Sequence, residues 1–277
     1  MKLVQRLVGL CLAGCLLLAG CARGGDGTDT PEPGTSRTTG DGTPQPAPAG
    51  VGIGLTLTPE DVAWLGAQPE AVLAPVSEMR VETVHLSFLI TDLIGQDGTV
   101  PARAKQVFQP LLSSLRASGV SEILLTVRGG YWENGGDDRF AFPYPDSDTG
   151  ESAEYLQYLK RYGAQLVALA RAYPEVTHWQ TGGGYDAGED MAHPVGSSGK
   201  FYPAERAAIN ADLAAAAKQA FAASGVAAKV VLGAFTLGAE PAGAENFLRE
   251  TCRYLASGES PLRVTGPGDG FDALSWK

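Results

Sequence analysis

The chain has 277 residues and a formal net charge of −10 at pH 7, with 31 acidic side chains against 21 Lys and Arg. This acidic balance argues against a surface that binds nucleic acid or anionic lipid, because both carry dense negative charge. It suits a neutral, polyhydroxylated ligand, and we expect no nucleic-acid partner.

The first twenty residues have the pattern of an export signal. Lys2 and Arg6 form a short positive start without an acid, and residues 7–18 are apolar residues, Gly and Cys only. That run is too short for a membrane-spanning helix, which needs about 20 residues. Loss of residues 1–20 would change the net charge to −10 − 2 = −12. A short anchor helix and an ordinary secretory signal are the alternatives.

The export signal ends in Leu18-Ala19-Gly20-Cys21. This resembles the lipobox of bacterial lipoproteins, in which small residues precede the cleavage site and the cysteine thiol takes a diacylglycerol. Leu12-Ala13-Gly14-Cys15 has the same pattern, but cleavage there would leave an apolar core of only a few residues. We therefore expect lipidation at Cys21, with the protein held through this lipid at the cell membrane on its extracytoplasmic side.

Residues 21–50 are predicted to be a disordered linker behind the lipidated cysteine. Gly, Thr, Pro and Asp dominate the segment and apolar anchors are absent. Such a segment cannot bury enough surface to offset its ordering entropy. Cys11 and Cys15 leave with the signal, so Cys252 is the one remaining thiol and no intrachain disulfide is expected.

Residues 51–277 read as one folded domain, in which short apolar runs alternate with stretches of helical period. The expected strands are 51–57, 84–90, 122–127, 177–181, 229–235 and 271–276. The expected helices are 75–80, 103–118, 153–173, 204–224 and 244–256, and residues 58–61 have the pattern of a further helix start. Strands that alternate with helices predict a parallel α/β sheet, either doubly wound or a TIM barrel.

Two features favour the barrel. The residues after the strands are rich in Gly, Trp, Tyr and Asp, where a barrel has its ligand face. No strand is followed by a phosphate loop, and residues 182–184 are glycines without the nucleotide-binding spacing, so no cofactor is expected. The prediction is an α/β fold of the (β/α)8 TIM-barrel type with about six of the eight units present. Because the chain ends inside the sixth expected strand, we expect a partial barrel from a truncated or incomplete sequence.

Several side chains near the strand ends are candidates for ligand binding. Arg128 ends the third strand, and Tyr131 and Trp132 follow it among glycines, where an aromatic ring lies open for stacking on a sugar or else folds onto the rim. Trp179 lies within the fourth strand, as core or as ligand contact, and Tyr185 follows that strand. The nearby loop acids are Glu133, Asp137 and Asp138.

The three histidines do not share the spacing of a metal site. His85, His178 and His193 lie far apart in the sequence, unlike the close pairs of a zinc motif, so no metal is expected. In a barrel, the strand position of His85 allows its side chain to point inward towards the site.

Residues 162–182 resemble the fourth unit of the retaining TIM-barrel glycoside hydrolases. In that clan a helix ends near Arg-Tyr-Pro and a strand reads roughly Trp-Glu-Ile-Gly-Asn-Glu. Residues 84–98, 117–127, 227–235 and 270–276 are similar to the second, third, fifth and sixth units. The resemblance implies a sugar-binding cleft at the carboxyl end of the strands and, in an active enzyme, acid/base attack by paired carboxylates.

The sequence departs from the clan at both catalytic positions. Trp179 matches the Trp of the fourth strand, and Gly184 then takes the place of the acid/base glutamate. The nearest carboxylates are Asp186 and Glu189, which become the candidate catalytic residues. The clan's nucleophile ends the seventh strand, and this chain stops in the sixth at Lys277.

Three hypotheses of function follow. The leading one is a surface-anchored glycoside-hydrolase-like lipoprotein that acts on an extracellular glycan. The alternative is a non-catalytic carbohydrate-binding lipoprotein without the two carboxylates. The third is a solute-binding or structural lipoprotein of unrelated α/β fold. The expected partners of the first two are a glycan or oligosaccharide and, through the lipid, a membrane.

Overall fold

The computed structural model describes residues 54–57, 70–131, 140–145, 152–188, 191, 201–235 and 241–276. Contacts divide the chain into two units, Met1–Ala49 and Gly50–Lys277, and every described residue belongs to the second. Cys21 and the predicted signal and linker lie outside the described residues. The same holds for Trp132, Glu133, Asp137, Asp138, Glu189 and His193. Within the described part, no helix is both long enough and apolar enough to cross a bilayer.

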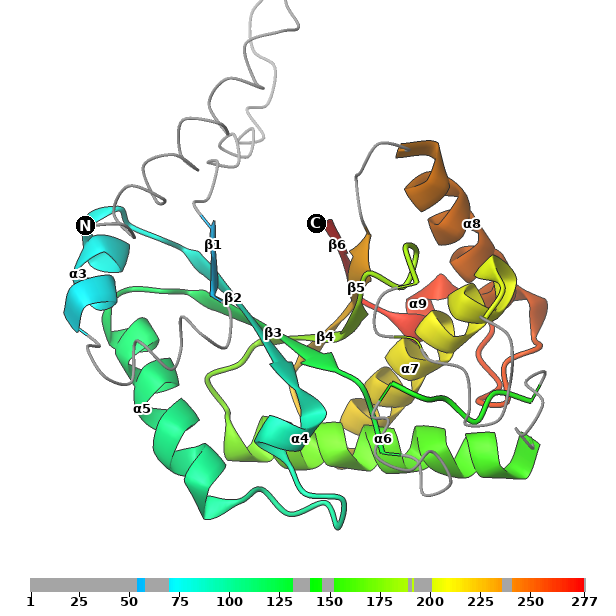
Figure 1. Ribbon diagram of the computed structural model, residues 1–277, viewed down its shortest axis with the longest axis horizontal. Coiled ribbons are helices and arrows are strands. Elements are labelled where there is room, and N and C mark those ends of the chain that lie inside the picture. Colours follow the sequence, from blue (N-terminus) through cyan, green and yellow to red (C-terminus); the bar gives the residue numbers. More distant parts are fainter. Residues whose placement is uncertain are drawn as a thin grey trace, which may run out of the picture. The chain divides into compact units, whose positions relative to one another are not determined.

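The described strands form one parallel sheet. They are β1 (Gly54–Leu57), β2 (Thr83–Leu89), β3 (Glu122–Arg128), β4 (His178–Gly183), β5 (Lys229–Phe235) and β6 (Ala273–Trp276). Their order in the sheet is β1-β2-β3-β4-β5-β6, and each neighbouring pair is parallel. A doubly wound sheet reverses its strand order at a switch point, whereas a β/α barrel does not. The predicted α/β fold of the barrel type is thus confirmed, with β1 and β6 at the two ends of a curved sheet (Figure 1).

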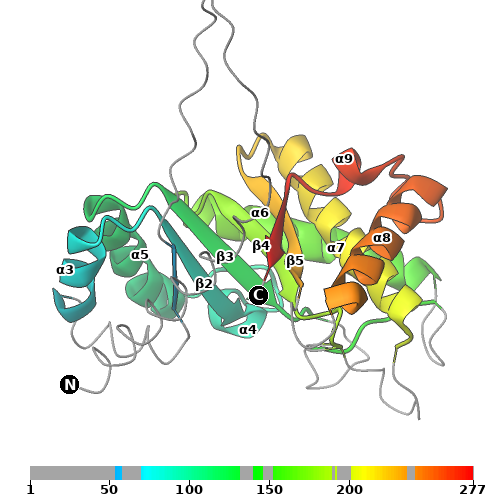
Figure 2. The ribbon, with the colours of Figure 1, turned by 90° about the horizontal axis from the view of Figure 1, so that it is seen from above.

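Helices connect the strands along one side of the sheet (Figure 2). They are α3 (Glu70–Glu78), α4 (Ile90–Leu93), α5 (Ala102–Ala117), α6 (Ser152–Ala172), α7 (Pro203–Ser224), α8 (Pro241–Ser257) and α9 (Pro267–Gly270). Helix α7 ends at Gly225, whose φ of 65° is the left-handed conformation that glycine adopts without a Cβ clash.

Several elements differ from the expectation. The helix expected at 75–80 is α3 at 70–78, the strand expected at 271–276 begins at Ala273, and α4 and α9 were not predicted. Two boundary differences have identifiable reasons. Strand β2 stops at Leu89 because Ile90 already begins the short helix α4. Strand β4 continues past Thr181 to Gly183, since its pairing with β5 continues to the Gly183–Ala234 pair. As a result, the last two residues of β4 are Gly182 and Gly183, at the edge where the site is expected.

The two faces of the sheet have different chemistry. In β2, Val84, Leu86 and Phe88 are buried and alternate with half-buried residues. The Phe88 ring meets the edge of Phe108 on α5 with ring centroids 4.5 Å apart. The apolar set therefore faces the helices. We call this the outer face, and the side with the alternate residues the inner face.

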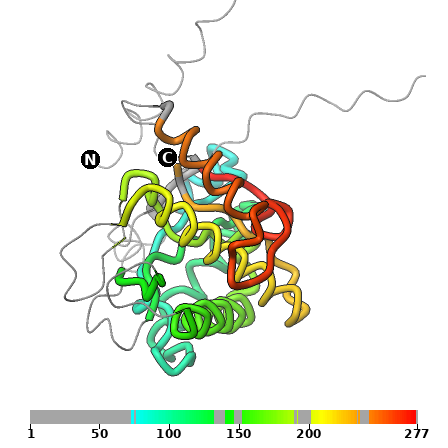
Figure 3. The backbone as a smooth tube through the Cα atoms, turned by 90° about the vertical axis from the view of Figure 1, so that its right-hand side faces the viewer, coloured from blue at the N-terminus to red at the C-terminus, as the bar shows by residue number. Residues whose placement is uncertain are grey.

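Helices α6 and α7 pack closely against each other, and Figure 3 shows them as neighbouring green and yellow coils. A Cβ built on Gly163 of α6 would lie 2.8 Å from the backbone oxygen of Ala216 and 3.0 Å from the Cβ of Ala220, both on α7. The glycine and the alanines thus allow a backbone approach that larger side chains would prevent. The alanine-rich sequence of α7 therefore reflects burial, because residues 207–217 are all buried.

Candidate functional site

The inner face carries a row of polar side chains across β2, β3 and β4. Residues that pair across parallel strands point to the same side of the sheet, and Ser87 pairs with Thr126, which pairs with Gln180. The His85 Nε2 atom lies 2.7 Å from Thr126 Oγ1, which joins β2 to β3 through their side chains. His85 thus lies on the inner face. Imidazole, hydroxyl and amide groups lie on this face, whereas the outer face of β2 and β3 is apolar.

Arg128 ends β3 at the carboxyl edge of the sheet. It pairs with Leu89 and is half-buried on the inner side. Its guanidinium carbon lies 5.8 Å from the centroid of the Phe140 ring, a cation–π distance. The Phe140 ring holds the Arg128 guanidinium at the carboxyl end of β3. A ligand bound at this edge would lie near a group that donates several hydrogen bonds.

Tyr131 lies at the same edge and ties two loops together. Its hydroxyl donates a hydrogen bond of 2.8 Å to the backbone oxygen of Ile94, which follows α4. The ring is half-buried and packs against the core. The position after β3 agrees with the sequence-based expectation. The hydroxyl is engaged with the backbone, so contact with a ligand would come from the ring.

The segment after β4 is built of glycines because the chain turns sharply there. Gly182 and Gly184 have φ values of 73° and 70°, which favour glycine. A Cβ on Gly182 would lie 2.1 Å from the Tyr185 ring, so this ring folds back over the strand. Gly184, which the sequence resemblance aligns with the clan's acid/base glutamate, therefore lies in this turn, where its positive φ favours glycine.

Tyr185 belongs to the core rather than to an open surface. It is 3% exposed, and its ring lies edge-on to Phe142 with centroids 6.1 Å apart. A sugar cannot stack on a ring that is covered in this way. The expectation of a ligand contact at Tyr185 is corrected by this burial, which follows from the left-handed turn at Gly182.

Trp179 is also a core residue, which decides between the two alternatives left open by the sequence. It is 0% exposed and lies on the outer face, where its ring meets Phe221 of α7 with centroids 6.4 Å apart. Since β4 alternates between faces, Gln180 and not Trp179 points to the inner side. The proposed ligand contact at Trp179 is therefore corrected.

Asp186 lies in the turn that follows β4, beside a cation from α7. It is half-buried, and its carboxylate interacts electrostatically with Arg206, whose pKa is lowered by burial and raised in part by this carboxylate. A Cβ on Gly188 would lie 2.5 Å from Arg206 Nη1, so the guanidinium lies against the same turn. Asp186 thus has a cationic neighbour, and a charged acceptor of this kind suits a ligand hydroxyl.

The remaining candidates lie away from this edge. His178 begins β4 at the opposite edge, its Nδ1 lies 2.9 Å from Thr177 Oγ1, and burial lowers its pKa. Cys252 of α8 is half-buried, and burial raises the pKa of its thiol. Among the residues that the structure describes, no three His, Cys, Asp or Glu are grouped so as to hold a metal ion.

Thr126 and Arg206 were not among the predicted site residues. Thr126 was detectable, because a hydroxyl at alternate positions of an otherwise apolar strand marks the face that avoids the helices. Arg206 gave no such indication, since the first turn of a helix often contains charged residues. Its place beside Asp186 depends on the turn after β4.

No protein-family model and no curated protein sequence matches the chain. Among solved structures, the catalytic domain of a GH30 xylanase C from Talaromyces cellulolyticus has a TM-score of 0.46 at 13% identity over 74% of this chain and 51% of that one. A GH5-4 broad specificity endoglucanase from Clostridium longisporum has 0.42 at 9% identity over 60% and 43%.

A β-glucosidase from Trichoderma harzianum gives a similar value, a TM-score of 0.43 at 16% identity over 68% of this chain and 41% of that one. The chain thus spans about half or less of the length of these structures. All three TM-scores are below 0.5, so the fold assignment rests on the strand order. The chain is an α/β protein whose six described strands follow one another as in a (β/α)8 barrel.

Proposed function

We propose that this protein binds or acts on an extracellular glycan at the carboxyl edge of its parallel sheet. The observation that carries the proposal is the polar inner face, which leads from His85 and Thr126 to Arg128 at the end of β3. Barrel proteins bind their ligands at this edge. A neutral polyol offers donors and acceptors to match such groups and is compatible with the acidic charge of the chain.

Binding without hydrolysis is the form of this proposal that the local geometry favours. Retaining hydrolysis needs two carboxyl groups roughly 5–5.5 Å apart. The described residues directly after β3 and β4, 129–131, 140–145 and 184–188, contain one carboxylate, Asp186. The glycine turn that ends in Gly184 supports the same view, because its left-handed backbone strains any other residue there.

Hydrolysis is the second candidate, and Asp186 is the observation that favours it. The residue follows Gly184 by two positions and lies at the edge where the clan has its acid. Glu189, the other candidate, lies outside the described residues. In this form of the proposal Asp186 would exchange a proton with the glycosidic oxygen.

We further propose that a lipid on Cys21 holds the domain at the outer side of a membrane. The support comes from residues 18–21 and from the positive and apolar segments before them. The Gly-, Thr- and Pro-rich residues 22–50 would then act as a spacer.

One experiment separates these possibilities. The full chain is mixed with a panel of soluble polysaccharides, and both the dissociation constant and the release of reducing sugar are measured. Binding without release supports the non-catalytic form. Release that Asp186→Asn lowers at least about 100-fold supports hydrolysis, since general acid catalysis contributes roughly 10²–10⁴-fold. Failure to bind any glycan at millimolar concentrations contradicts both forms.

A further inference from the structure

Tyr202 is the most exposed large hydrophobic side chain in the described part of the chain. Its exposed fraction is 72%, against 45% for Val107 on α5 and 37% for Leu274 in β6. Single exposed aliphatic residues are common on protein surfaces. An aromatic ring differs from them, because it offers a wide apolar face on which another flat group can stack.

The exposed ring lies at the carboxyl edge of the sheet. Tyr202 is the N-cap residue of α7, the helix that follows β4. A Cβ built on Gly188 would lie 2.5 Å from Arg206 Nη1, so the first turn of α7 lies beside the turn after β4. Figure 2 shows α7 among the helices outside the sheet. Tyr202 therefore shares its edge with Arg128 but belongs to the helix layer.

The backbone on both sides of Tyr202 is fixed. Phe201 is 5% exposed and belongs to the core, and Pro203 occupies the first helical position, where its ring fixes φ. The Tyr202 N–H donates a 2.5 Å hydrogen bond to the Glu205 carboxylate. The Tyr202 carbonyl accepts a 3.0 Å hydrogen bond from the Arg206 N–H. A ligand that stacks on this ring thus has little backbone freedom to remove.

Arg206 places hydrogen-bond donors near the ring. It lies one helical turn after Tyr202, and residues at this spacing are neighbours on a helix surface. Its side chain is half-buried and interacts electrostatically with Asp186 in the turn after β4. A pyranose has an apolar face of C–H groups and a rim of hydroxyls. An open aromatic ring suits the apolar face, and a guanidinium suits the hydroxyls.

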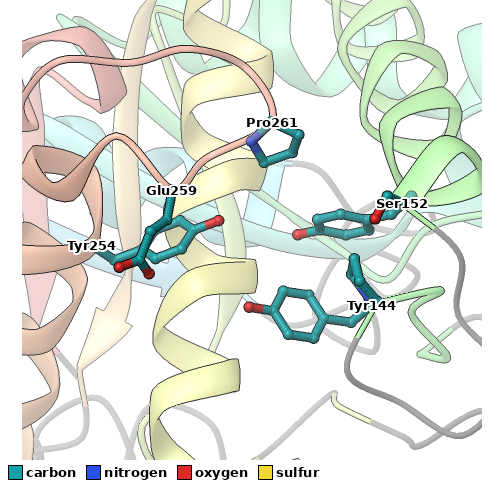
Figure 4. Close-up of a pocket in the computed structure, with 7 residues that line it drawn as sticks. Tyr144, Ser152, Tyr254, Glu259 and Pro261 are labelled. Carbon is teal, nitrogen blue, oxygen red and sulfur yellow. The ribbon is translucent and has the colours of Figure 1, made fainter.

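The pocket between α6 and the end of α8 has no comparable open ring. Figure 4 shows Tyr144 and Tyr254 on two sides of this pocket, whose volume is about 250 Å³. Tyr155 and Tyr254 are 1% and 8% exposed, and both hydroxyls donate hydrogen bonds of 3.0 Å to Oδ2 of Asp212. Oδ1 of Asp212, which is 0% exposed, accepts a 2.6 Å hydrogen bond from Ser260. We call Asp212 and these three donors the Asp212 cluster, which joins α6, α7, α8 and the loop after α8.

We propose that Tyr202 is a stacking platform for one sugar unit of a glycan chain, with Arg206 beside it to donate hydrogen bonds to the hydroxyls of that unit. This inference rests on the proposed function, because it extends the glycan site from the inner face to the helix layer. A ligand that contacts both Arg128 and Tyr202 reaches from the sheet to the helices outside it. The site therefore takes a chain of several sugar units rather than a single sugar.

The test uses the full chain, purified in a neutral detergent, and the polysaccharide that binds it best. Short and long fragments are prepared from this polysaccharide, and titration calorimetry gives their dissociation constants. For the longest fragment, Tyr202→Ala should weaken binding about tenfold, the loss expected for one aromatic stacking contact. For the shortest fragment that binds, the loss should stay below about twofold, because that fragment remains at Arg128.

Two further variants separate the ring from other effects. Tyr202→Phe keeps the ring and should bind the longest fragment within about threefold of wild type. Val107→Ala removes an exposed apolar side chain from α5 and should leave every affinity unchanged. Since Tyr202 and Val107 are both exposed, thermal unfolding of the two Ala variants should match that of wild type.

The outcomes distinguish this inference from the proposed function. If wild type and Tyr202→Ala bind the longest fragment equally well, the platform is wrong and the glycan site at Arg128 stands. A loss of the same size for every fragment length overturns the extension from Arg128 to Tyr202. A loss for Tyr202→Phe as large as that for Tyr202→Ala overturns stacking on the ring. If wild type binds no glycan, the proposed function fails and this inference fails with it.

Discussion

Replacement of Asp212 by Asn should change how stability depends on pH. Burial raises the pKa of Asp212 from its ordinary value of 3.8 to about 6, although the three hydroxyl donors act in the opposite direction. Between these two values the folded protein binds more protons than the unfolded chain. The contribution of Asp212 to stability is therefore greatest at low pH and falls as the pH rises from about 4 to about 6.

The size of the effect follows from the same two values. Each pKa unit corresponds to about 1.4 kcal/mol, so the ionised carboxylate lowers the free energy of unfolding by about 3 kcal/mol at pH 7. At pH 4 the penalty is about 0.5 kcal/mol, because the pKa of the unfolded form lies close to that pH. Asp212→Asn removes this titration. The stability of the variant relative to wild type should thus rise by about 2 kcal/mol between pH 4 and pH 7.

Urea denaturation followed by tryptophan fluorescence at pH 4, 5, 6 and 7 measures this difference, and other titrating groups cancel between the two proteins. Asp272→Asn is a control of opposite sign. The Asp272 carboxylate pairs with Lys218 at 2.6 Å and accepts from the Val230 backbone, and its pKa is lowered, against the effect of burial. Its contribution is lost as the pH falls. A stability difference between wild type and Asp212→Asn that stays constant across the four pH values refutes the reasoning.

Three further predictions concern packing and targeting. Gly163→Ala should lower the free energy of unfolding by about 1–3 kcal/mol, because its Cβ would press on α7. If urea denaturation instead shows a free energy of unfolding about 1 kcal/mol higher, as helix propensity alone predicts, then α6 and α7 move apart enough to accept the methyl group. Trp179→Ala should cost about 3–5 kcal/mol through the cavity it leaves, while the glycan affinity of the folded fraction is unchanged. A loss of glycan affinity in the folded variant would show that Trp179 contacts the ligand after all. Cys21→Ser should move the protein from the membrane to the soluble fraction of cells, whereas Cys15→Ser should not. Membrane retention of Cys21→Ser would exclude Cys21 as the anchor.

The parallel fold was predictable because the strands and the four long helices each have their own periodic pattern, whereas the short helices α4 and α9 do not. Residues 229–235 match β5 at both ends, and residues 204–224 differ from α7 only at Pro203. The predicted boundaries were wrong where pairing with a neighbouring element determines the end of a strand. Strand β4 is longer than expected because it pairs with β5 as far as Gly183, and no local pattern contains that information.

The site was less predictable, since burial depends on contacts that are distant in sequence. Arg128 and Tyr131 lie at the carboxyl edge as expected. Trp179 and Tyr185 were candidates because aromatic residues near strand ends often bind ligands, yet one faces α7 and the other folds over Gly182. The Asp212 cluster was missed altogether. Its one indication in the sequence is an acid in the middle of an alanine-rich helix.

The glycan affinities of Arg128→Met and Arg171→Met test the central claim most directly. Arg128 ends β3 at the carboxyl edge of the sheet, whereas Arg171 lies in the last turn of α6, which leads to the amino end of β4. Calorimetry with the polysaccharide that binds best should show a loss of at least about tenfold for Arg128→Met, the value of one charged hydrogen bond, and less than twofold for Arg171→Met. If both variants bind as tightly as wild type while their thermal unfolding is unchanged, the glycan does not bind at the carboxyl edge and the account is wrong.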